Sequence, residues 1–363
     1  MTKTKIGVIG TGSISDVYLS SPQKFLNYEI AGVADINVER AQEQAEKHQI
    51  PFSGSVSELL EKEDIELVVN LTIPAAHKEV SIKALQAGKH VYSEKPLATT
   101  CNDGLLVMEE ARRLGLHVGT APDTFLGAGL QTCRALLDQG VIGEPVGASA
   151  FMLGRGPESW HPNPEFFYKQ GAGPLFDLGP YYLTALISLL GPVSQVASMN
   201  RVTVPEREIT SEPFAGTKIK VEVPTYVSSL LQFSTGISAS FITSFDVWDT
   251  KLPKIEIYGT KGTLLVPDPN EFNGPVYFMN NETTGWQEAD LVSSYTDNCR
   301  GIGLADMLRG IKEGRPYLCS GDLGLHVLEV MEAILESSDK KRFLELETNC
   351  RRPERLTGFQ YQD

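Results

Sequence analysis

Lys5-Ile-Gly-Val-Ile9 and Gly10-Thr-Gly-Ser-Ile-Ser15 follow each other directly near the start of the chain. The first stretch is a short apolar run, which is typical of a strand buried on both faces of a parallel sheet. In a dinucleotide-binding fold, the first glycine of the next turn permits a tight bend, and the second lets the backbone approach a diphosphate. The predicted phosphate loop uses Gly10, Gly12, Ser13 and Ile14.

The rest of the first third of the chain repeats this alternation of strand and helix. Short, apolar, often β-branched runs occur at residues 5–9, 29–34, 65–71, 90–93 and 116–119. Helical patterns lie between them, at residues 14–25, 38–48, 55–61, 75–87 and 102–114. Continuous apolar strands that alternate with helices predict a doubly wound α/β domain of the Rossmann type. We place this domain at residues 1–122.

The pattern changes after Pro122. A helical segment at residues 129–138 leads into strands in which apolar and polar residues alternate, at 146–153, 193–204, 225–233, 237–244, 254–258 and 263–266. Alternation is typical of an antiparallel sheet with one covered and one open face. Two helical stretches follow, at residues 303–313 and 323–337, before a short strand. We therefore predict an α+β domain with a mostly antiparallel sheet over residues 123–363.

Asp35 ends the second predicted strand, about twenty residues after the glycine loop. A carboxylate at this place accepts hydrogen bonds from the adenosine ribose and repels a 2′-phosphate, so it favours NAD over NADP. Arg40 lies one helical turn further on, and we expect it to be solvated. An aspartate that caps the next helix would occupy the same position, and the sequence leaves that alternative open.

Gly88-Lys-His-Val-Tyr-Ser-Glu94-Lys95-Pro96-Leu-Ala is the most distinctive stretch of the chain. It resembles the Glu-Lys-Pro motif of the Gfo/Idh/MocA family of nicotinamide-dependent sugar and polyol oxidoreductases. Thr72-Ile-Pro-Ala-Ala-His77 and Gly171-Ala-Gly-Pro-Leu-Phe-Asp177-Leu-Gly-Pro-Tyr181 extend the resemblance over nearly the whole chain. The resemblance implies a Rossmann domain, a substrate-binding and oligomerisation domain with a large open sheet, and an active site in the cleft between them. The resemblance also implies five further contacts with the cofactor, which are Thr72, His77, Glu94, Lys95 and Pro96.

Lys95 follows a predicted parallel strand, at the end where such folds bind ligands. The resemblance implies that Pro96, often preceded by a cis bond in this family, directs Lys95 toward the nicotinamide. Burial beside an oxidised nicotinamide would lower the pKa of a lysine from its usual value of about 10.4. Lys95 could then hydrogen-bond the reacting hydroxyl and relay its proton.

Asp177 and Tyr181 are four residues apart on a helical pattern over residues 176–190, so they share one face. The resemblance implies that Asp177 orients the substrate and that the residue four positions later takes the proton. Many family members carry histidine there, whereas Tyr181 matches the branch of glucose–fructose oxidoreductase and dihydrodiol dehydrogenase. The sequence leaves open whether Tyr181 or Lys95 is the base, and whether Tyr181 only fills the core.

Two departures from the family pattern concern the cofactor. The segment Thr72–His77 lacks the usual Asn and has a shifted Pro, and Thr124-Phe125 stands where many members have Arg-Phe. A cofactor contact from His77 therefore competes with the alternative of an ordinary histidine on a helix face.

A proline-interrupted aromatic loop, residues 158–168, precedes the Asp177 helix. Trp160 could cover the C–H face of a sugar ring, and His161 could donate to a hydroxyl. Packing under the sheet or at a subunit contact explains the loop equally well. Further substrate candidates are Asp246, Trp248 and Arg300, whereas we expect a structural role for His326.

Composition excludes several classes of protein. The chain has 32 Lys and Arg against 46 Asp and Glu, and its formal charge of -14 repels nucleic acid and anionic lipid. The five cysteines are scattered without a C-x-x-C pair, which indicates free thiols, and we predict no metal site. No targeting segment or apolar run of membrane-spanning length is evident. We expect a cytoplasmic protein without nucleic-acid or membrane partners.

These observations predict an NAD(P)-dependent dehydrogenase, with NAD favoured, that transfers a hydride between a sugar or polyol CH–OH carbon and nicotinamide. The resemblance and the open sheet imply a homodimer or homotetramer joined through the second domain. Two other functions stay open. One is a dinucleotide sensor that regulates a partner without catalysis, and the other is an NAD-dependent glycosidase.

Overall fold

The computed structural model describes residues 3–357, which form two compact units. Within this range, the first unit holds residues 3–127, 294–328 and 353–357, and the second holds residues 128–293 and 329–352. Residues 294–328 therefore belong to the first unit, although the sequence placed them in the second domain. A long-range backbone hydrogen bond links this segment to strand residues of the first unit, since the amide of Thr120 donates to the carbonyl of Cys319 at 3.0 Å.

The first unit is built on a parallel sheet, which confirms the doubly wound prediction. Among the described residues its six strands lie in the order β3-β2-β1-β4-β5-β6, and every neighbouring pair is parallel. The strands are β1 (Thr4–Ile9), β2 (Tyr28–Ala34), β3 (Ser53–Gly54), β4 (Leu67–Asn70), β5 (His90–Ser93) and β6 (Val118–Thr120). β3 was not predicted, because two residues give no periodic pattern.

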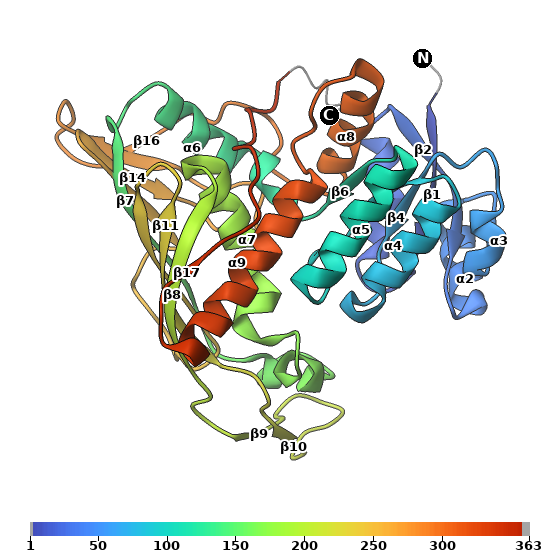
Figure 1. Ribbon diagram of the computed structural model, residues 1–363, viewed down its shortest axis with the longest axis horizontal. Helices are drawn as coiled ribbons and strands as arrows, with labels where there is room; N and C mark the ends of the chain where they lie inside the picture. Colours follow the sequence, from blue (N-terminus) through green and yellow to red (C-terminus); the bar gives the residue numbers. More distant parts are fainter. Residues whose placement is uncertain (1–2, 358–363) are drawn as a thin grey trace. The chain divides into compact units, whose positions relative to one another are not determined.

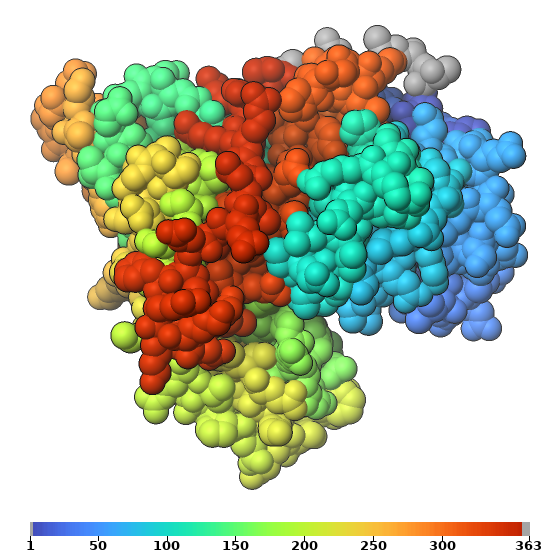
Figure 2. Space-filling model, in the orientation of Figure 1, coloured from blue at the N-terminus to red at the C-terminus, as the bar shows by residue number. Residues whose placement is uncertain are grey.

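Helices with clear capping signals surround this sheet. Asn37 caps α2, Ser55 forms a capping box on α3, and Thr100 caps α5, which ends at the left-handed Gly115. Helices α4 and α5 run side by side across the sheet (Figure 1), and their residues form a continuous stretch of the surface seen in Figure 2. The helices are α1 (Ser15–Ser20), α2 (Val38–His48), α3 (Val56–Leu60), α4 (His77–Gln86), α5 (Cys101–Leu114) and α8 (Ile302–Glu313).

The second unit contains a larger, open sheet. Within residues 3–357 its nine strands lie in the order β16-β15-β14-β13-β7-β12-β11-β8-β17, and the pair β12–β7 is parallel while the others are antiparallel. The mostly antiparallel prediction is therefore confirmed. The strands are β7 (Pro145–Leu153), β8 (Val193–Arg201), β11 (Tyr226–Phe233), β12 (Ser238–Ser244), β13 (Ile255–Gly259), β14 (Gly262–Val266), β15 (Tyr277–Asn280), β16 (Gln287–Glu288) and β17 (Leu344–Glu345).

One face of the large sheet is covered by helices α6 (Ala128–Asp138) and α7 (Gly173–Leu190) (Figure 1). Successive side chains of strand β11 point to opposite faces of the sheet, so Val227, Leu231 and Phe233 are buried on the covered face whereas Leu230 is exposed on the other. A separate pair of short antiparallel strands, β9 (Glu206–Glu208) and β10 (Lys218–Lys220), was not predicted. Helix α9 (Gly321–Lys340) completes the helices described here. In the part of the chain that the structure describes, no helix is long and apolar enough to cross a membrane.

Candidate functional site

The glycine loop between β1 and α1 has the shape that a phosphate group requires. Gly10 has a φ of 98°, and a Cβ there would lie 2.6 Å from the backbone of Leu71, so only glycine fits. A Cβ built on Gly12 meets nothing within 4 Å, so this side of the loop is open. Ser13 is exposed and Ile14 half-buried in the same turn. The predicted residues therefore form an open loop that fits a diphosphate.

Asp35 is the residue at the end of β2, and it is only 4% exposed. Its carboxylate accepts hydrogen bonds from the amide and hydroxyl of Thr11 at 2.8 and 2.9 Å and from the amide of Asn37 at 2.9 Å. Burial raises the pKa of Asp35, but these hydrogen bonds and Arg40 lower it, and the net result is below its ordinary value. Asp35 is thus held as a carboxylate, while the cap of α2 is Asn37.

Arg40 corrects one expectation. Its Nη2 donates to both carboxylate oxygens of Asp35, at 2.8 Å each, so it is paired rather than solvated. The pair forms because α2 begins directly after β2 and its first turn brings Arg40 back over the strand end. The acid predicted to bind the ribose therefore has a cationic partner, which the sequence did not indicate.

The Glu-Lys-Pro segment follows β5 at the carboxyl edge of the parallel sheet, as predicted. Glu94 accepts a hydrogen bond from the hydroxyl of Tyr18 at 2.7 Å and another from the backbone amide of Lys95 at 2.9 Å. Burial, together with the charge of Glu94, raises the pKa of Tyr18, so its hydroxyl stays protonated and donates. The peptide bond between Lys95 and Pro96 is cis. Glu94 thus fixes the backbone from which the catalytic candidate projects.

Thr72 and His77 lie at the neighbouring strand end, and His77 differs from what was expected. The hydroxyl of Thr72 donates to the Asn70 side chain at 2.7 Å. His77 is 0% exposed, and its Nδ1 and Nε2 lie 2.7 and 2.9 Å from the carbonyl oxygens of Pro96 and Thr72. The prediction that His77 contacts the cofactor is wrong, because the ring has no exposed surface and both nitrogens face the backbone.

Asp177 and Tyr181 belong to the second unit, on helix α7. They lie four residues apart and share a face, as the sequence predicted, with Asp177 half-buried and Tyr181 8% exposed. The helix begins at Gly173, three residues before the predicted start, and contains Pro180.

The aromatic loop of the second unit is ordered by ring contacts. His161 packs edge-on against Trp160, Phe166 and Phe167, with ring centroids 5.2 to 5.5 Å apart. Its Nδ1 accepts a hydrogen bond from the amide of Asn163 at 3.0 Å. Trp160 is 66% exposed, so its indole face remains available to a ligand.

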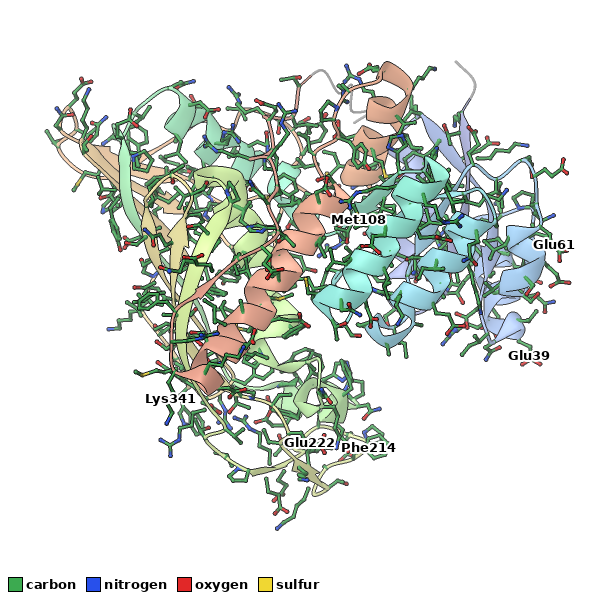
Figure 3. All side chains as sticks on the ribbon, viewed as in Figure 1. Glu39, Glu61, Met108, Phe214, Glu222 and Lys341 are labelled. Atoms are coloured by element: carbon green, nitrogen blue, oxygen red, sulfur yellow. The ribbon has the colours of Figure 1, made fainter. Side chains whose placement is uncertain are left out.

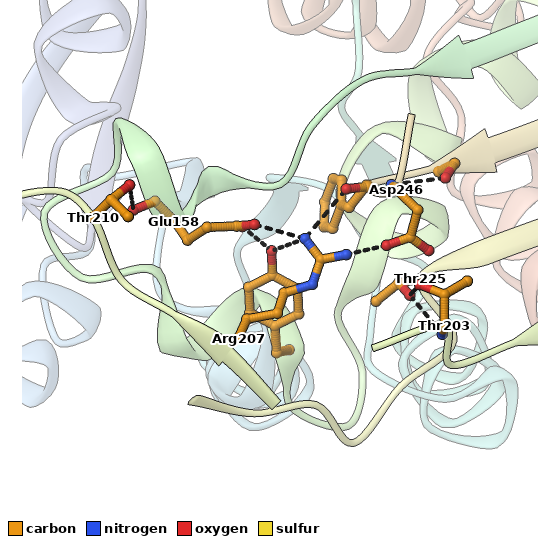
Figure 4. A network of polar contacts seen from close by, with 9 residues as sticks. Glu158, Thr203, Arg207, Thr210, Thr225 and Asp246 are labelled. Carbon is orange, nitrogen blue, oxygen red and sulfur yellow. Dashed lines mark hydrogen bonds and ion pairs between the residues drawn. The ribbon is translucent and has the colours of Figure 1, made fainter. Parts of the chain in front are cut away.

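Beside this loop lies a buried ionic network that sequence reasoning missed (Figure 4). Arg207, on β9, donates to Glu158 at 2.7 Å and also forms an ion pair with Asp246. Tyr168 donates its hydroxyl to Glu158. The side chain of Arg207 is 9% exposed, so one guanidinium holds together the aromatic loop and the end of β12. A polar segment with mixed charges gave no sign of this burial, because charged residues there are usually solvated.

The segment that carries β9 also supports the aromatic loop through its backbone. The amides of Thr210 and Ser211 donate to the carbonyl of Glu158 at 2.8 and 3.1 Å, and the Ser211 hydroxyl donates to the carbonyl of His161 at 2.6 Å. Phe214 and Glu222 lie further along the same segment (Figure 3), where Phe214 is exposed. The position of Trp160 and His161 therefore depends on residues some fifty positions later in the chain.

The other candidates are dispersed. Asp246 is occupied by Arg207, whereas Trp248 is exposed and carries Arg155 at 3.5 Å from its ring centroid. Arg300 lies in the first unit, where its charge lowers the pKa of Asp123; burial still raises that pKa to about 6. His326 is fully buried, which agrees with the expected structural role.

Replacing Arg207 by methionine is expected to lower the free energy of unfolding by about 3–5 kcal/mol, because two buried carboxylates would lose their shared cation. Urea unfolding followed by circular dichroism measures the effect. A matched control is Lys218→Ala on the paired strand β10, since Lys218 and its partner Glu206 are exposed and the free energy should stay nearly unchanged. Equal stability of the two variants would contradict a structural role of the network.

Comparisons with known proteins agree with this geometry. Residues 4–121 match the family model described as an oxidoreductase family with an NAD-binding Rossmann fold, and residues 130–265 match the GFO/IDH/MocA C-terminal domain. The chain is 27% identical over 266 residues to trans-1,2-dihydrobenzene-1,2-diol dehydrogenase of Bos taurus, covering 72% of this chain and 74% of that protein. It is 26% identical over 268 residues to 1,5-anhydro-D-fructose reductase of Ensifer adhaerens, covering 71% and 74%.

A crystal structure of an NAD-binding oxidoreductase from Klebsiella pneumoniae has the same fold. It aligns with a TM-score of 0.83 at 21% sequence identity, over 96% of this chain and 100% of that chain. The two family models together span the glycine loop, the Glu-Lys-Pro segment and the helix that carries Asp177 and Tyr181. The chain therefore belongs to the Gfo/Idh/MocA family of oxidoreductases, with its NAD-binding Rossmann domain at residues 4–121.

Proposed function

We propose that the protein is an NAD-dependent dehydrogenase that oxidises a CH–OH group of a sugar or polyol, or reduces the corresponding carbonyl. The observation that carries the proposal is the Lys95 segment. Its backbone is fixed by Glu94 at the carboxyl edge of a dinucleotide-binding sheet, where ligands of such folds bind. Relatives named as a dihydrodiol dehydrogenase and an anhydrofructose reductase support a substrate with neighbouring hydroxyl groups.

The residues of the first unit fit the cofactor. We propose that the open loop at Gly12 holds the diphosphate and that the carboxylate of Asp35 binds the adenosine ribose. Bound NAD supplies the acceptor for the hydride. The fixed position of Lys95 then serves to hold the substrate carbon close to that acceptor, since orientation is a large part of such catalysis.

We assign the proton chemistry to Lys95, Asp177 and Tyr181. Lys95 hydrogen-bonds the reacting oxygen and stabilises the charge that develops as its proton leaves. Asp177 accepts a hydrogen bond from a substrate hydroxyl, and Tyr181 exchanges a proton with the substrate. Trp160 and His161 bind the remainder of the sugar, the first through its exposed indole face.

A panel of sugars and polyols tests this proposal. Purified protein is mixed with each compound and NAD or NADP, and absorbance of the reduced nicotinamide is followed together with product analysis. We expect net reduction of NAD by at least one polyhydroxy compound. Binding of dinucleotide without turnover across the panel would instead support a sensor, and sugar release without net reduction would support a glycosidase.

We further propose that the protein acts in the cytoplasm as a homodimer or homotetramer joined through the open face of the second unit's sheet. Strand register places four exposed side chains on this face, which are Met199, Leu230, Tyr258 and Met279. An open apolar face of this kind favours association. Light scattering coupled to size-exclusion chromatography measures the mass, and a monomer at micromolar concentration would contradict the proposal.

A further inference from the structure

We propose that His77 is a positioning residue, which holds the backbone of Lys95 in place by bracing the carbonyl of Pro96 against that of Thr72. The inference rests on the proposed function, because it assigns His77 a role through Lys95. In this role His77 contacts the protein's own backbone, where the sequence predicted a contact with the cofactor.

The brace spans two adjacent strand ends. β4 and β5 are parallel, with Asn70 opposite Ser93 in the register. Thr72 lies two residues beyond the end of β4, and Pro96 lies three residues beyond the end of β5. His77, the first residue of α4, therefore connects the two loops that leave this edge of the sheet, with its nitrogens 2.7 and 2.9 Å from their carbonyl oxygens.

The start of the helix that carries the ring is itself fixed. The side-chain amide of Asn70 donates to the carbonyl of His77 at 3.0 Å and to the hydroxyl of Ser81 at 3.1 Å. The other side-chain atom of Asn70, Oδ1, accepts from the amide and hydroxyl of Thr72. Asn70, His77 and Ser81 are all fully buried, so no water competes for these hydrogen bonds.

Two contacts then fix the backbone around Lys95. Glu94 accepts from the amide on the N-terminal side of Lys95, and His77 holds the carbonyl of Pro96 on the C-terminal side. Burial lowers the pKa of His77, so the ring is neutral and only one of its nitrogens carries a hydrogen. A carbonyl only accepts, so only one of the two contacts is a hydrogen bond, and we place the hydrogen on Nδ1, which is at the shorter distance, from Pro96. A side chain that projects from a backbone held at both sides reaches a defined place, which is what an acid–base group requires.

Asparagine and glutamine at position 77 test the contact to Pro96 and the contact to Thr72 separately. Asparagine places its amide nitrogen near the position of histidine Nδ1, which faces Pro96, and glutamine places it near that of Nε2, which faces Thr72. We expect His77→Ala and His77→Gln to lower kcat by about 100-fold, the effect of a displacement of about 1 Å. His77→Asn should recover most of that loss, since it restores the donor to Pro96.

Three measurements on the full chain give the readout, namely kcat, the Kd for NADH from its fluorescence, and the melting temperature. The Kd should be unchanged in every variant, so the effect falls on kcat. Ser81→Ala is the matched structural control, because it removes one hydrogen bond from the same buried cluster and leaves both carbonyl contacts intact. It should lower the melting temperature without changing kcat.

The inference is overturned if asparagine and glutamine at position 77 give the same kcat, or if kcat follows the melting temperature through all variants, Ser81→Ala included. The asparagine–glutamine comparison decides the matter even if His77→Ala does not fold. Failure of the proposed function looks different, since the unaltered protein would then give no net reduction of NAD with any compound of the panel. Turnover retained by Lys95→Ala would remove the role of Lys95 on which the inference rests. An inactive Lys95→Ala beside a fully active His77→Ala contradicts the positioning role alone.

Discussion

Replacing Lys95 by alanine should lower kcat by about 10²–10⁴-fold, the usual contribution of a positioned acid–base group, while the Kd for NAD stays unchanged. The expectation follows from the role proposed for the Lys95 side chain. We propose that the loop at Gly12 and the carboxylate of Asp35 bind the dinucleotide, whereas Lys95 acts on the substrate. Loss of the ammonium group therefore removes a step of the reaction and leaves the cofactor site complete.

Stopped-flow measurement of nicotinamide reduction and fluorescence titration with NADH separate these two effects. Lys89 provides a matched control, because it precedes the same strand β5, is buried, and donates to the carbonyl of Lys62 at 2.7 Å. Lys89→Ala should reduce stability and keep kcat. Added methylamine should restore part of the turnover of Lys95→Ala, since it supplies the missing amine. Weaker NAD binding with unchanged chemistry in the bound fraction would refute the assigned role.

The sequence predicted those parts of the molecule that local patterns determine. Strand β5 and helix α2 have the predicted bounds, because an apolar run and an amphipathic run with clear caps each define one element. The spacing of Asp177 and Tyr181 placed them on one helix face for the same reason. The Glu-Lys-Pro segment was located at the correct end of its strand, since parallel strands alternate with helices in a fixed direction.

Contacts between distant segments could not be predicted. Residues 319 and 320 pair with the end of β6 through backbone groups, which any sequence can form, so the division between the units was misplaced. His77 was assigned to the cofactor from the family resemblance, and its partners, two backbone carbonyls, leave no signal in the sequence. The burial of Arg207 could not be predicted, because it depends on ion pairs with Glu158 and Asp246, which lie on separate loops.

The ion pair between Arg40 and Asp35 is a contact that the sequence did not predict and that we expect to affect the choice of cofactor. The guanidinium of Arg40 covers both oxygens of Asp35, and the side chain is 46% exposed. If Asp35 binds the ribose as proposed, the ribose and Arg40 compete for the same carboxylate. With the carboxylate present, a 2′-phosphate meets a negative charge, and Arg40 is neutralised by its partner. We therefore expect discrimination against NADP to depend on Asp35, although Arg40, a cation suited to NADP, already lies beside it.

Replacing Asp35 by serine should shift the ratio of kcat/KM values for NADP and NAD toward NADP by about 10³-fold. Loss of the charge-assisted hydrogen bonds to the ribose weakens NAD by about 1.5–3 kcal/mol. Removal of the like charge relieves a repulsion of several kcal/mol for NADP, and the released Arg40 can pair with the phosphate. Initial rates with each dinucleotide, at a saturating concentration of the same polyol, measure the ratio.

The double variant Asp35→Ser, Arg40→Ala identifies the phosphate partner. It should lose most of the NADP gain while its kcat/KM for NAD resembles that of Asp35→Ser, because Arg40 has no role toward NAD once the carboxylate is gone. Arg40→Ala alone should keep NADP excluded, since Asp35 is then an unshielded charge held by Thr11 and Asn37. If Arg40→Ala alone admits NADP, or if serine at position 35 leaves the ratio unchanged, the carboxylate is not the group that discriminates between the two cofactors.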